Sequence, residues 1–328
     1  MSARPRLLII KTSSLGDVVH ALPVVTDALA FNREWQIDWV CEEAFADIPA
    51  LHPGVQRVIP CAVRRWRRTW WTGRGRREID EFRHRLAEVG YDAVIDLQGL
   101  LKSAWITRQA RGLRHGYAWG SAREPLATLA YQRRHAVPWG QHAIARNRQL
   151  AAAAFGYPVI GEPRYGVQSI DPAAVAASPY IVALHATSRD DKLWPEAHWR
   201  TLFAAASERK LRIFLPWGSA IERQRSERLA AGIPNAEVPE RMTPRALFQF
   251  FAQAEFVVGV DTGLAHLAAA SGAPTIVLFG ASDPALTGVI GAGAPAINLG
   301  GRGRFPTVDD VTGAIAALPL RRPAVKSS

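Results

Sequence analysis

Polar and charged residues follow four apolar runs of this sequence, at the points where strands would end. They are TSSLGD at 12–17, ATSRDDKLWP at 186–195, WGSAIE at 217–222 and DTG at 261–263, after RLLIIK, YIVALH, LRIFLP and FVVGV. In open α/β sheets, ligands bind outside the carboxyl ends of the strands. Hydroxyls, carboxylates, glycines and a lysine at four such ends are more than turn formation requires, so they predict a ligand site.

The DTG turn and the helix expected after it are suited to phosphate. Gly263 lets the backbone approach a ligand without interference from a Cβ atom. The free N–H groups of the helix's first turn, with the helix dipole, form an anion site. Asp261 and Thr262 can cap the helix, and His266 lies about one turn further. The ordinary alternative is that these two residues only cap and that His266 is a hydrogen-bonded core residue.

Lys192 lies between two of these turns, where its charge would stabilise a diphosphate. Asp190 and Asp191 beside it allow the alternative of a metal site, because Mg²⁺ takes carboxylates together with phosphates. We favour a metal-free site, since aspartate pairs are common in surface turns. Glu222 falls in the first turn of a helix, where a carboxylate is favoured, and it can also accept hydrogen bonds from ribose hydroxyls. No GxGxxG motif follows a strand, which disfavours hydride chemistry.

The formal charge of +11 is concentrated in one segment. Residues 64–77, RRWRRTWWTGRGRR, carry seven arginines, three tryptophans and no acid, so 11 − 7 leaves +4 for the rest. The simplest interpretation is a solvated basic loop. Arginine forks match phosphate and carboxylate oxygens, however, and tryptophan favours membrane–water interfaces. We therefore favour an anionic ligand, a lipid headgroup or a nucleic acid as the partner of this segment.

Strand-like and helix-like runs alternate along the chain and position these residues. We expect strands at 6–11, 36–41, 56–61, 92–99, 180–185, 211–216, 256–260 and 274–280, and helices near 17–30, 78–90, 101–111, 144–155, 195–208, 220–231 and 244–253. Near-continuous apolar strands that alternate with helices predict parallel sheets covered on both faces. The fold class is α/β, with two Rossmann-like domains, 1–165 and 166–328, facing each other across a cleft. Their boundary falls in the proline-rich segment 156–179, and the basic tail after residue 318 is expected to be frayed.

Three features bear on the compartment. Cys41 and Cys61 cannot form a disulfide framework, which fits a reducing environment. The N-terminal apolar run has only four residues, too few for a signal peptide. Residues 262–282 lack charged side chains over about the length of a membrane span, but glycine and proline interrupt them. A buried helix followed by a buried strand is the better interpretation, in a soluble protein.

Seven motifs in order resemble the lipopolysaccharide heptosyltransferases of the GT-B fold. They are KTSSLGDVVHALP, RRWRR, YDAVIDLQGLLKSA, AREPLA, ATSRDDKLWPEAHWR, LPWG and VDTGLAHLAAA, spread over about residues 6–317. RRWRR and ATSRDDKLWP are similar to the type I enzymes of that family. The resemblance implies inverting transfer of L-glycero-D-manno-heptose from ADP-L-glycero-β-D-manno-heptose to Kdo, an acidic eight-carbon sugar, on lipid A. We also expect a monomer without cofactor, essential metal or nucleic acid, peripheral on the cytoplasmic face of the bacterial inner membrane.

The resemblance also assigns roles to residues. Asp17 matches the catalytic base, although it could instead only cap its helix, and Lys192 would assist departure of the diphosphate. The expected donor contacts are Thr187, Ser188, Lys192, Glu222, Met242, Asp261, Thr262, Gly263 and His266. The expected acceptor contacts are Arg64, Arg65, Arg68, Gln98 and Arg123. Ser188 stands where relatives often have threonine, which keeps a hydroxyl.

Three alternative functions remain open on the sequence. A heptosyltransferase II would prefer a heptose-terminated acceptor to a Kdo-terminated one. A nucleic-acid-binding protein would explain the positive charge and the tryptophans but not the polar residues at four strand ends. A nucleotide-sugar epimerase on the same fold would act without any lipid acceptor.

Overall fold

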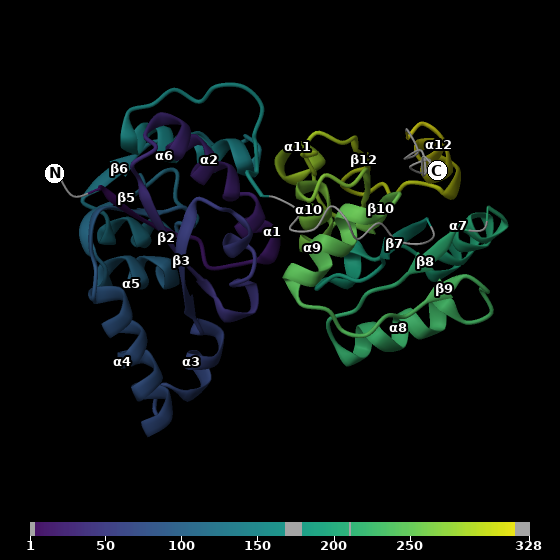
Figure 1. Cartoon of the computed structure of the whole chain (residues 1–328), viewed down its shortest axis with the longest axis horizontal. Coiled ribbons are helices and arrows are strands. Elements are labelled where there is room, and N and C mark those ends of the chain that lie inside the picture. Colours follow the sequence, from purple (N-terminus) through teal and green to yellow (C-terminus); the bar gives the residue numbers. More distant parts are fainter. Residues whose placement is uncertain (1–3, 168–178, 210, 319–328) are drawn as a thin grey trace, which may run out of the picture. The chain divides into compact units, whose positions relative to one another are not determined.

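The structure, a computed structural model, describes residues 4–167, 179–209 and 211–318. The chain forms two compact units, Met1–Gln168 and Ser169–Ser328, which we describe separately (Figure 1). Residues 168–178 of the expected linker, and the expected frayed tail at 319–328, lie outside the described residues.

The first unit is a six-stranded parallel sheet with helices around it. Its strands are β1 (Arg6–Ile10), β2 (Gln36–Glu42), β3 (Val55–Cys61), β4 (Gly90–Asp96), β5 (Arg111–Tyr117) and β6 (Arg133–His135), in the spatial order β3-β2-β1-β4-β5-β6. Its helices are α1 (Leu15–Val19), α2 (Leu22–Phe31), α3 (Val63–Thr69), α4 (Gly73–Ala87), α5 (Leu101–Gln109) and α6 (Ala143–Phe155). The short 3₁₀ helices are η1 (Glu43–Phe45), η2 (Pro49–Leu51) and η3 (Pro125–Ala130).

The central position of β1 places its carboxyl end inside the unit. β1 pairs with β2 on one side and β4 on the other, with Ile10 opposite both Val40 and Asp96. Its residues Leu7 to Ile10 are fully buried, which explains the uninterrupted apolar run. Because parallel strands end at the same edge, the residues just after β1 and β4 lie side by side.

The second unit repeats the architecture. Its strands are β7 (Tyr180–Leu184), β8 (Arg212–Phe214), β9 (Ala236–Glu237), β10 (Phe256–Val260), β11 (Thr275–Phe279) and β12 (Ala296–Gly300), in the order β12-β11-β10-β7-β8-β9, all parallel. Its helices are η4 (Asp190–Lys192), α7 (Glu196–Glu208), α8 (Ala220–Ala230), α9 (Pro244–Gln253), α10 (Gly263–Ala270), α11 (Pro284–Thr287) and α12 (Val308–Ala316). The core contains Trp194 and Trp199, fully buried and edge to face with ring centroids 5.1 Å apart.

Most expected elements are confirmed, but three expectations were wrong. The helix expected over 17–30 is two helices, α1 and α2, with Pro23 in the first turn of α2, where proline is tolerated. The residues expected to form a basic loop instead build α3 and the start of α4. Trp66 on α3 is buried against Phe82 of α4, with ring centroids 5.2 Å apart, and this packing stabilises the helix pair. Pro195 precedes α7 as its N-cap residue rather than opening it.

The uncharged stretch 262–282 forms α10 and β11, as expected. Among the described residues, no helix combines the length and apolar character needed to cross a membrane. Cys41 and Cys61 are buried free thiols. Strands β5 and β6 were missed because arginine, histidine and glycine dominate them.

Candidate active site

A small, open pocket lies at the carboxyl edge of the sheet in the first unit. Its lining comes from residues at the ends of β1, β4 and β5, from α1, from the segment before η3 and from the start of α6. The residues are Lys11, Asp17, Leu97, Gln98, Tyr117, Ser121, Arg123, Ala143, Arg146 and Asn147. The pocket thus unites three residues singled out in the sequence, Asp17, Gln98 and Arg123, with residues that were not.

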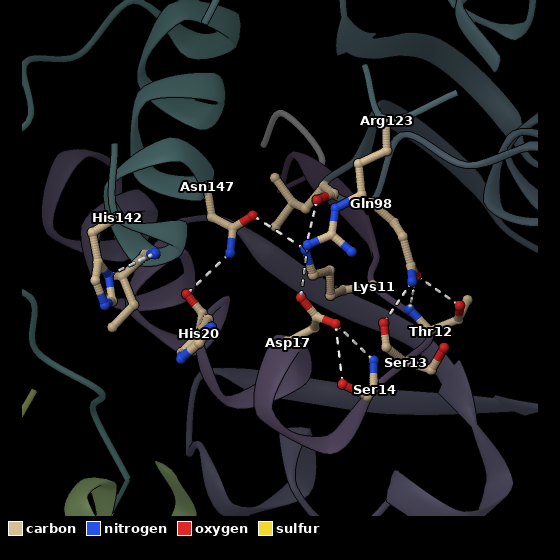
Figure 2. A network of polar contacts seen from close by, with 12 residues as sticks. Lys11, Thr12, Ser13, Ser14, Asp17, His20, Gln98, Arg123, His142 and Asn147 are labelled. Carbon is tan, nitrogen blue, oxygen red and sulfur yellow. Dashed lines mark hydrogen bonds and ion pairs between the residues drawn. The ribbon is translucent and has the colours of Figure 1, made fainter. Parts of the chain in front are cut away.

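Asp17 is partly buried in the first turn of α1, and its two oxygens have different neighbours (Figure 2). Oδ2 accepts hydrogen bonds from the backbone N–H of Ser14 at 2.9 Å and from its hydroxyl at 3.1 Å. Oδ1 lies 3.7 Å from a guanidinium nitrogen of Arg123. Burial alone would raise the pKa of Asp17, but Lys11, Arg123 and the Ser14 hydrogen bonds outweigh it and hold the pKa below 3.8. The carboxylate therefore caps its helix and stays ionised in the pocket.

Gln98 fixes the turn that carries Asp17. Its buried Oε1 accepts hydrogen bonds from the Thr12 backbone N–H at 2.8 Å and hydroxyl at 2.7 Å, while Nε2 donates to the Ser13 carbonyl at 2.5 Å. Behind it, buried Asp96 accepts from the backbone N–H of Gln98 at 2.8 Å and from the hydroxyl of Tyr131 at 2.7 Å. Gln98 thus positions the loop between β1 and α1, and its expected contact with the acceptor stays a prediction.

The sequence analysis missed two cations of the pocket. Lys11 follows β1, and its buried ammonium donates to the Leu97 carbonyl at 2.8 Å and to Asn147 Oδ1 at 3.3 Å. Burial lowers the pKa of Lys11 to about 8. A lysine at the end of the central apolar run was the available signal. Arg146 lies in α6, whose alanine-rich sequence gave no indication of a site.

Residues that follow β7 and β11 of the second unit converge on Asp261, which follows β10. The ammonium of Lys192, from η4, donates to Asp261 Oδ2 at 2.5 Å. The hydroxyl of Ser282, after β11, donates to the same oxygen, and the hydroxyl of Thr187 donates to the Asp261 carbonyl at 3.3 Å. The structure thus brings Thr187, Lys192 and Asp261 together, and their expected contact with a donor stays a prediction. Ser282 was missed, although it follows the apolar run TIVLF.

Comparison with known proteins identifies the family of this chain. Residues 79–312 match the sequence profile of glycosyltransferase family 9, the heptosyltransferases. The chain belongs to this family.

Curated family members are similar over most of their length. Lipopolysaccharide heptosyltransferase 1 of Pseudomonas aeruginosa PAO1 is 50% identical over 293 residues, which cover 87% of this chain and 81% of the relative. The enzyme of the same name from Escherichia coli K12 is 47% identical over 290 residues, which cover 87% of this chain and 91% of the relative. These relatives confirm the prediction that this chain is a lipopolysaccharide heptosyltransferase.

Solved structures of family members share the fold. The E. coli heptosyltransferase WaaC with ADP has a TM-score of 0.89 and 44% identity, covering 95% of this chain and 99% of that one. The same protein with ADP-2-deoxy-2-fluoro heptose has a TM-score of 0.85 and 42% identity, with the same coverage. The expected α/β GT-B fold with two parallel sheets is confirmed.

The expectation that the side chains of Asp261 and Thr262 cap α10 was wrong. Asp261 is not the N-cap residue of α10, and its Oδ2 accepts from Lys192 and Ser282. Thr262 is the N-cap residue by its backbone conformation, but its side chain makes no capping hydrogen bond. Gly263 opens α10, and His266 is buried within that helix.

The other expected donor contacts of the heptosyltransferase site are less closely joined. Glu222 caps α8, since its Oε2 accepts from the backbone N–H groups of Gly218 at 2.7 Å and Ser219 at 3.0 Å. Ser188 is exposed in the turn after β7, and Met242 is half-buried before α9. Asp191, weighed as a metal ligand with Asp190, forms an exposed ion pair with Arg189.

The expected acceptor contacts divide between two places. Gln98 and Arg123 line the pocket with Asp17, whereas the three arginines of α3 do not. Arg65 is paired with Glu43 at 3.1 Å and with Glu78, and the Arg64 guanidinium lies 5.6 Å from the ring centroid of Phe45. Arg68 is exposed. Their contact with an acceptor stays a prediction.

Proposed function

We propose that this protein transfers L-glycero-D-manno-heptose from ADP-L-glycero-β-D-manno-heptose to Kdo of Kdo-lipid A, with inversion at the anomeric carbon. The observation that carries the proposal is an ionised carboxylate, Asp17, in a pocket whose other charged side chains are cations. Support comes from relatives that are named lipopolysaccharide heptosyltransferase 1 and from a WaaC structure that holds an ADP-heptose analogue.

Asp17 acts as the general base in this proposal. It takes the proton of the acceptor hydroxyl as the hydroxyl oxygen bonds to the anomeric carbon and the bond to the diphosphate breaks. The low pKa of Asp17 ensures that the base is ionised at neutral pH. It also makes the base weaker than one with a pKa near the working pH, so positioning must supply part of the rate.

The second unit binds the donor and stabilises the departing ADP. Lys192 and the N–H groups at the start of α10 supply positive polarity for the diphosphate. Fixed donors of this kind stabilise developing charge without reorganisation, so the proposal includes no metal. The donor contacts are those expected from the sequence: Thr187, Ser188, Glu222, Met242, Asp261, Thr262, Gly263 and His266.

The α3–α4 segment attaches the enzyme to the cytoplasmic face of the inner membrane. These helices extend together beyond the sheet (Figure 1), and Trp70 and Trp71 in the turn between them are 58% and 56% exposed. Several arginines around them are exposed: Arg67, Arg68, Arg74, Arg76 and Arg77. Arginine near an anionic surface contributes about 1 kcal/mol per residue, and tryptophan favours the interface. The enzyme acts as a peripheral monomer, without nucleic acid.

The test is transfer by the purified protein with ADP-heptose, Kdo-lipid A and a chelator, followed by mass spectrometry of the lipid. We expect a mass increase of one heptose. A heptose-terminated acceptor tests the heptosyltransferase II alternative, and omission of acceptor tests the epimerase. The proposal is wrong if Kdo-lipid A remains unmodified, or if heptose is added only to the heptose-terminated lipid.

A further inference from the structure

The pocket around Asp17 carries more positive charge than its own residues neutralise. Three of its ten lining side chains are cationic, Lys11, Arg123 and Arg146, and one is anionic. Among the described residues, Arg123 alone of these three cations forms an ion pair, a long 3.7 Å contact to Asp17. Among residues 4–167, no carboxylate lies within ion-pair distance of Lys11 or Arg146. Lys11 is buried, Arg146 is half-buried, and the carboxylates of Asp17 and Asp96 act on Lys11 only from beyond ion-pair distance. A buried cation without a contacting counter-charge is unfavourable, which favours the binding of an anion here.

The hydrogen bonds of Lys11 are to neutral groups. Its ammonium has three protons, of which two are directed to Leu97 and Asn147. The amide of Asn147 is itself oriented, because its Nδ2 donates to the carbonyl of His20 at 3.2 Å (Figure 2). A third donor remains on a fixed ammonium that lines the pocket. Burial lowers the pKa of Lys11 to about 8, so a bound anion would strengthen its charge.

Arg146 is held by aromatic rings. Its guanidinium carbon lies 3.7 Å from the centroid of the Trp139 ring and 5.1 Å from that of Tyr117, and one terminal nitrogen donates to the Ser121 carbonyl at 2.7 Å. Its Nε is buried without a hydrogen-bond partner. A guanidinium fixed over rings retains an edge whose donors match two carboxylate oxygens.

We propose that Lys11 and Arg146, with Arg123, bind the carboxylate of the acceptor sugar beside the hydroxyl that Asp17 deprotonates. The proposal rests on the proposed function, since Kdo carries its carboxylate and its hydroxyls on one sugar. Anchoring the acid at a fixed place next to the base orients the attacking hydroxyl, which is a large source of rate. The alternative source of an anion is a phosphate of lipid A, which the experiment separates.

The test compares two water-soluble, deacylated Kdo acceptors, one with a free carboxylate and one with a carboxamide. The wild type should have about tenfold to a hundredfold lower kcat/KM on the carboxamide, the size of a lost charged hydrogen bond. Lys11→Met and Arg146→Met should lose a similar factor on the free acid and little more on the carboxamide. Arg108→Met, which removes an exposed cation from α5, is the matched control and should behave as wild type.

Several outcomes would overturn the proposal. If Lys11→Met and Arg146→Met lower kcat/KM equally on the free acid and the carboxamide, the loss is general and the proposal is wrong. Calorimetric binding of ADP checks that the variants are folded. A loss that follows removal of the lipid phosphates rather than of the carboxylate would assign the cations to phosphate. Calorimetric binding of a Kdo glycoside to wild type and variants gives a readout without transfer. Absence of transfer by the wild type contradicts the proposed function. Equal affinity of the wild type and all variants for the Kdo glycoside contradicts only the proposed carboxylate-binding site.

Discussion

The carboxylate of Asp17 lies 3.7 Å from the guanidinium of Arg123, while its other oxygen caps α1 through Ser14. One side chain therefore stabilises its helix and presents an ionised oxygen to the pocket. The capping and catalytic interpretations of Asp17 are not exclusive, because each uses a different oxygen. Substitutions that keep the cap but remove the base can separate them.

Asp17→Asn and Asp17→Ala should both lower transfer by about 10²- to 10⁴-fold, because each removes the general base. Asp17→Asn retains an oxygen that can cap, whereas Asp17→Ala should also cost about 1 kcal/mol of stability. Steady-state kinetics and thermal unfolding measure the two effects, and ADP affinity should not change. Near-normal turnover of Asp17→Asn would leave the residue with capping alone.

The acid limb of the pH–rate profile should report on Asp17 and its cationic neighbours. Lys11 and Arg123 hold the pKa of this carboxyl below 3.8, so kcat/KM should fall only when the pH drops through that lowered pKa. The stability due to the shift is likewise present above the unfolded-state pKa and lost as the pH falls through the folded-state pKa. Arg123→Met should raise the pH of the acid limb, and an unchanged limb would contradict the electrostatic role of Arg123.

Lys11→Met should make the protein more stable while impairing it as an enzyme. Burial lowers the pKa of Lys11 from 10.5 to about 8, so folding disfavours the charged amine at neutral pH. Wild-type stability should rise between pH 8 and 10.5, where the unfolded chain binds a proton that the folded chain does not. Lys11→Met should lack that rise and gain roughly 1–3 kcal/mol at pH 7. Denaturant unfolding at several pH values measures both effects, and a loss of stability at pH 7 would contradict this account.

The strand-end rule predicted that polar residues distant in sequence would meet at one edge of each sheet, because parallel strands end at the same edge. Thr187 and Lys192 follow β7, whereas Asp261 follows β10, and hydrogen bonds join them at that edge. It could not predict that Lys192 and Ser282 would both donate to one oxygen of Asp261, or that Thr262 rather than Asp261 would be the N-cap residue of α10. That choice depends on three-dimensional distances that sequence spacing does not encode.

The residues missed in the first unit show a second limit. Arg146 is half-buried and is held at the pocket by contacts with the rings of Trp139 and Tyr117, which precede α6 in the chain. Similarly, the α3 segment was expected to be a loop because its arginines suggested solvent on every side. Burial of Trp66 against Phe82 makes it a helix with one apolar side, a contact that depends on the docking of α4.

Lys192→Met should lower transfer by about 10²- to 10³-fold, the size of losing one fixed donor at a developing charge. It should also weaken ADP binding, because the ammonium is directed to the site of the diphosphate in the proposed mechanism. Ser282→Ala should have a smaller effect, since Asp261 keeps its contact with Lys192. Kinetics and calorimetry with ADP measure these changes. Arg223→Met, an exposed cation on α8, is the control, and an equal loss in that variant would point to net charge rather than to Lys192.

Membrane attachment through α3 and α4 should depend on exposed arginines rather than on net charge alone. Changing Arg67, Arg68 and Arg76 to glutamine should weaken binding to vesicles with anionic lipid by about a hundredfold, from about 1 kcal/mol per residue. The same variant should have a higher KM for Kdo-lipid A and unchanged ADP affinity.

A triple change of exposed arginines in the second unit is the matched control: Arg223, Arg302 and Arg304. Vesicle sedimentation at low and high salt measures binding, which should weaken with salt in the wild type. Equal losses in the two triple variants would show that the α3–α4 segment has no special part in attachment.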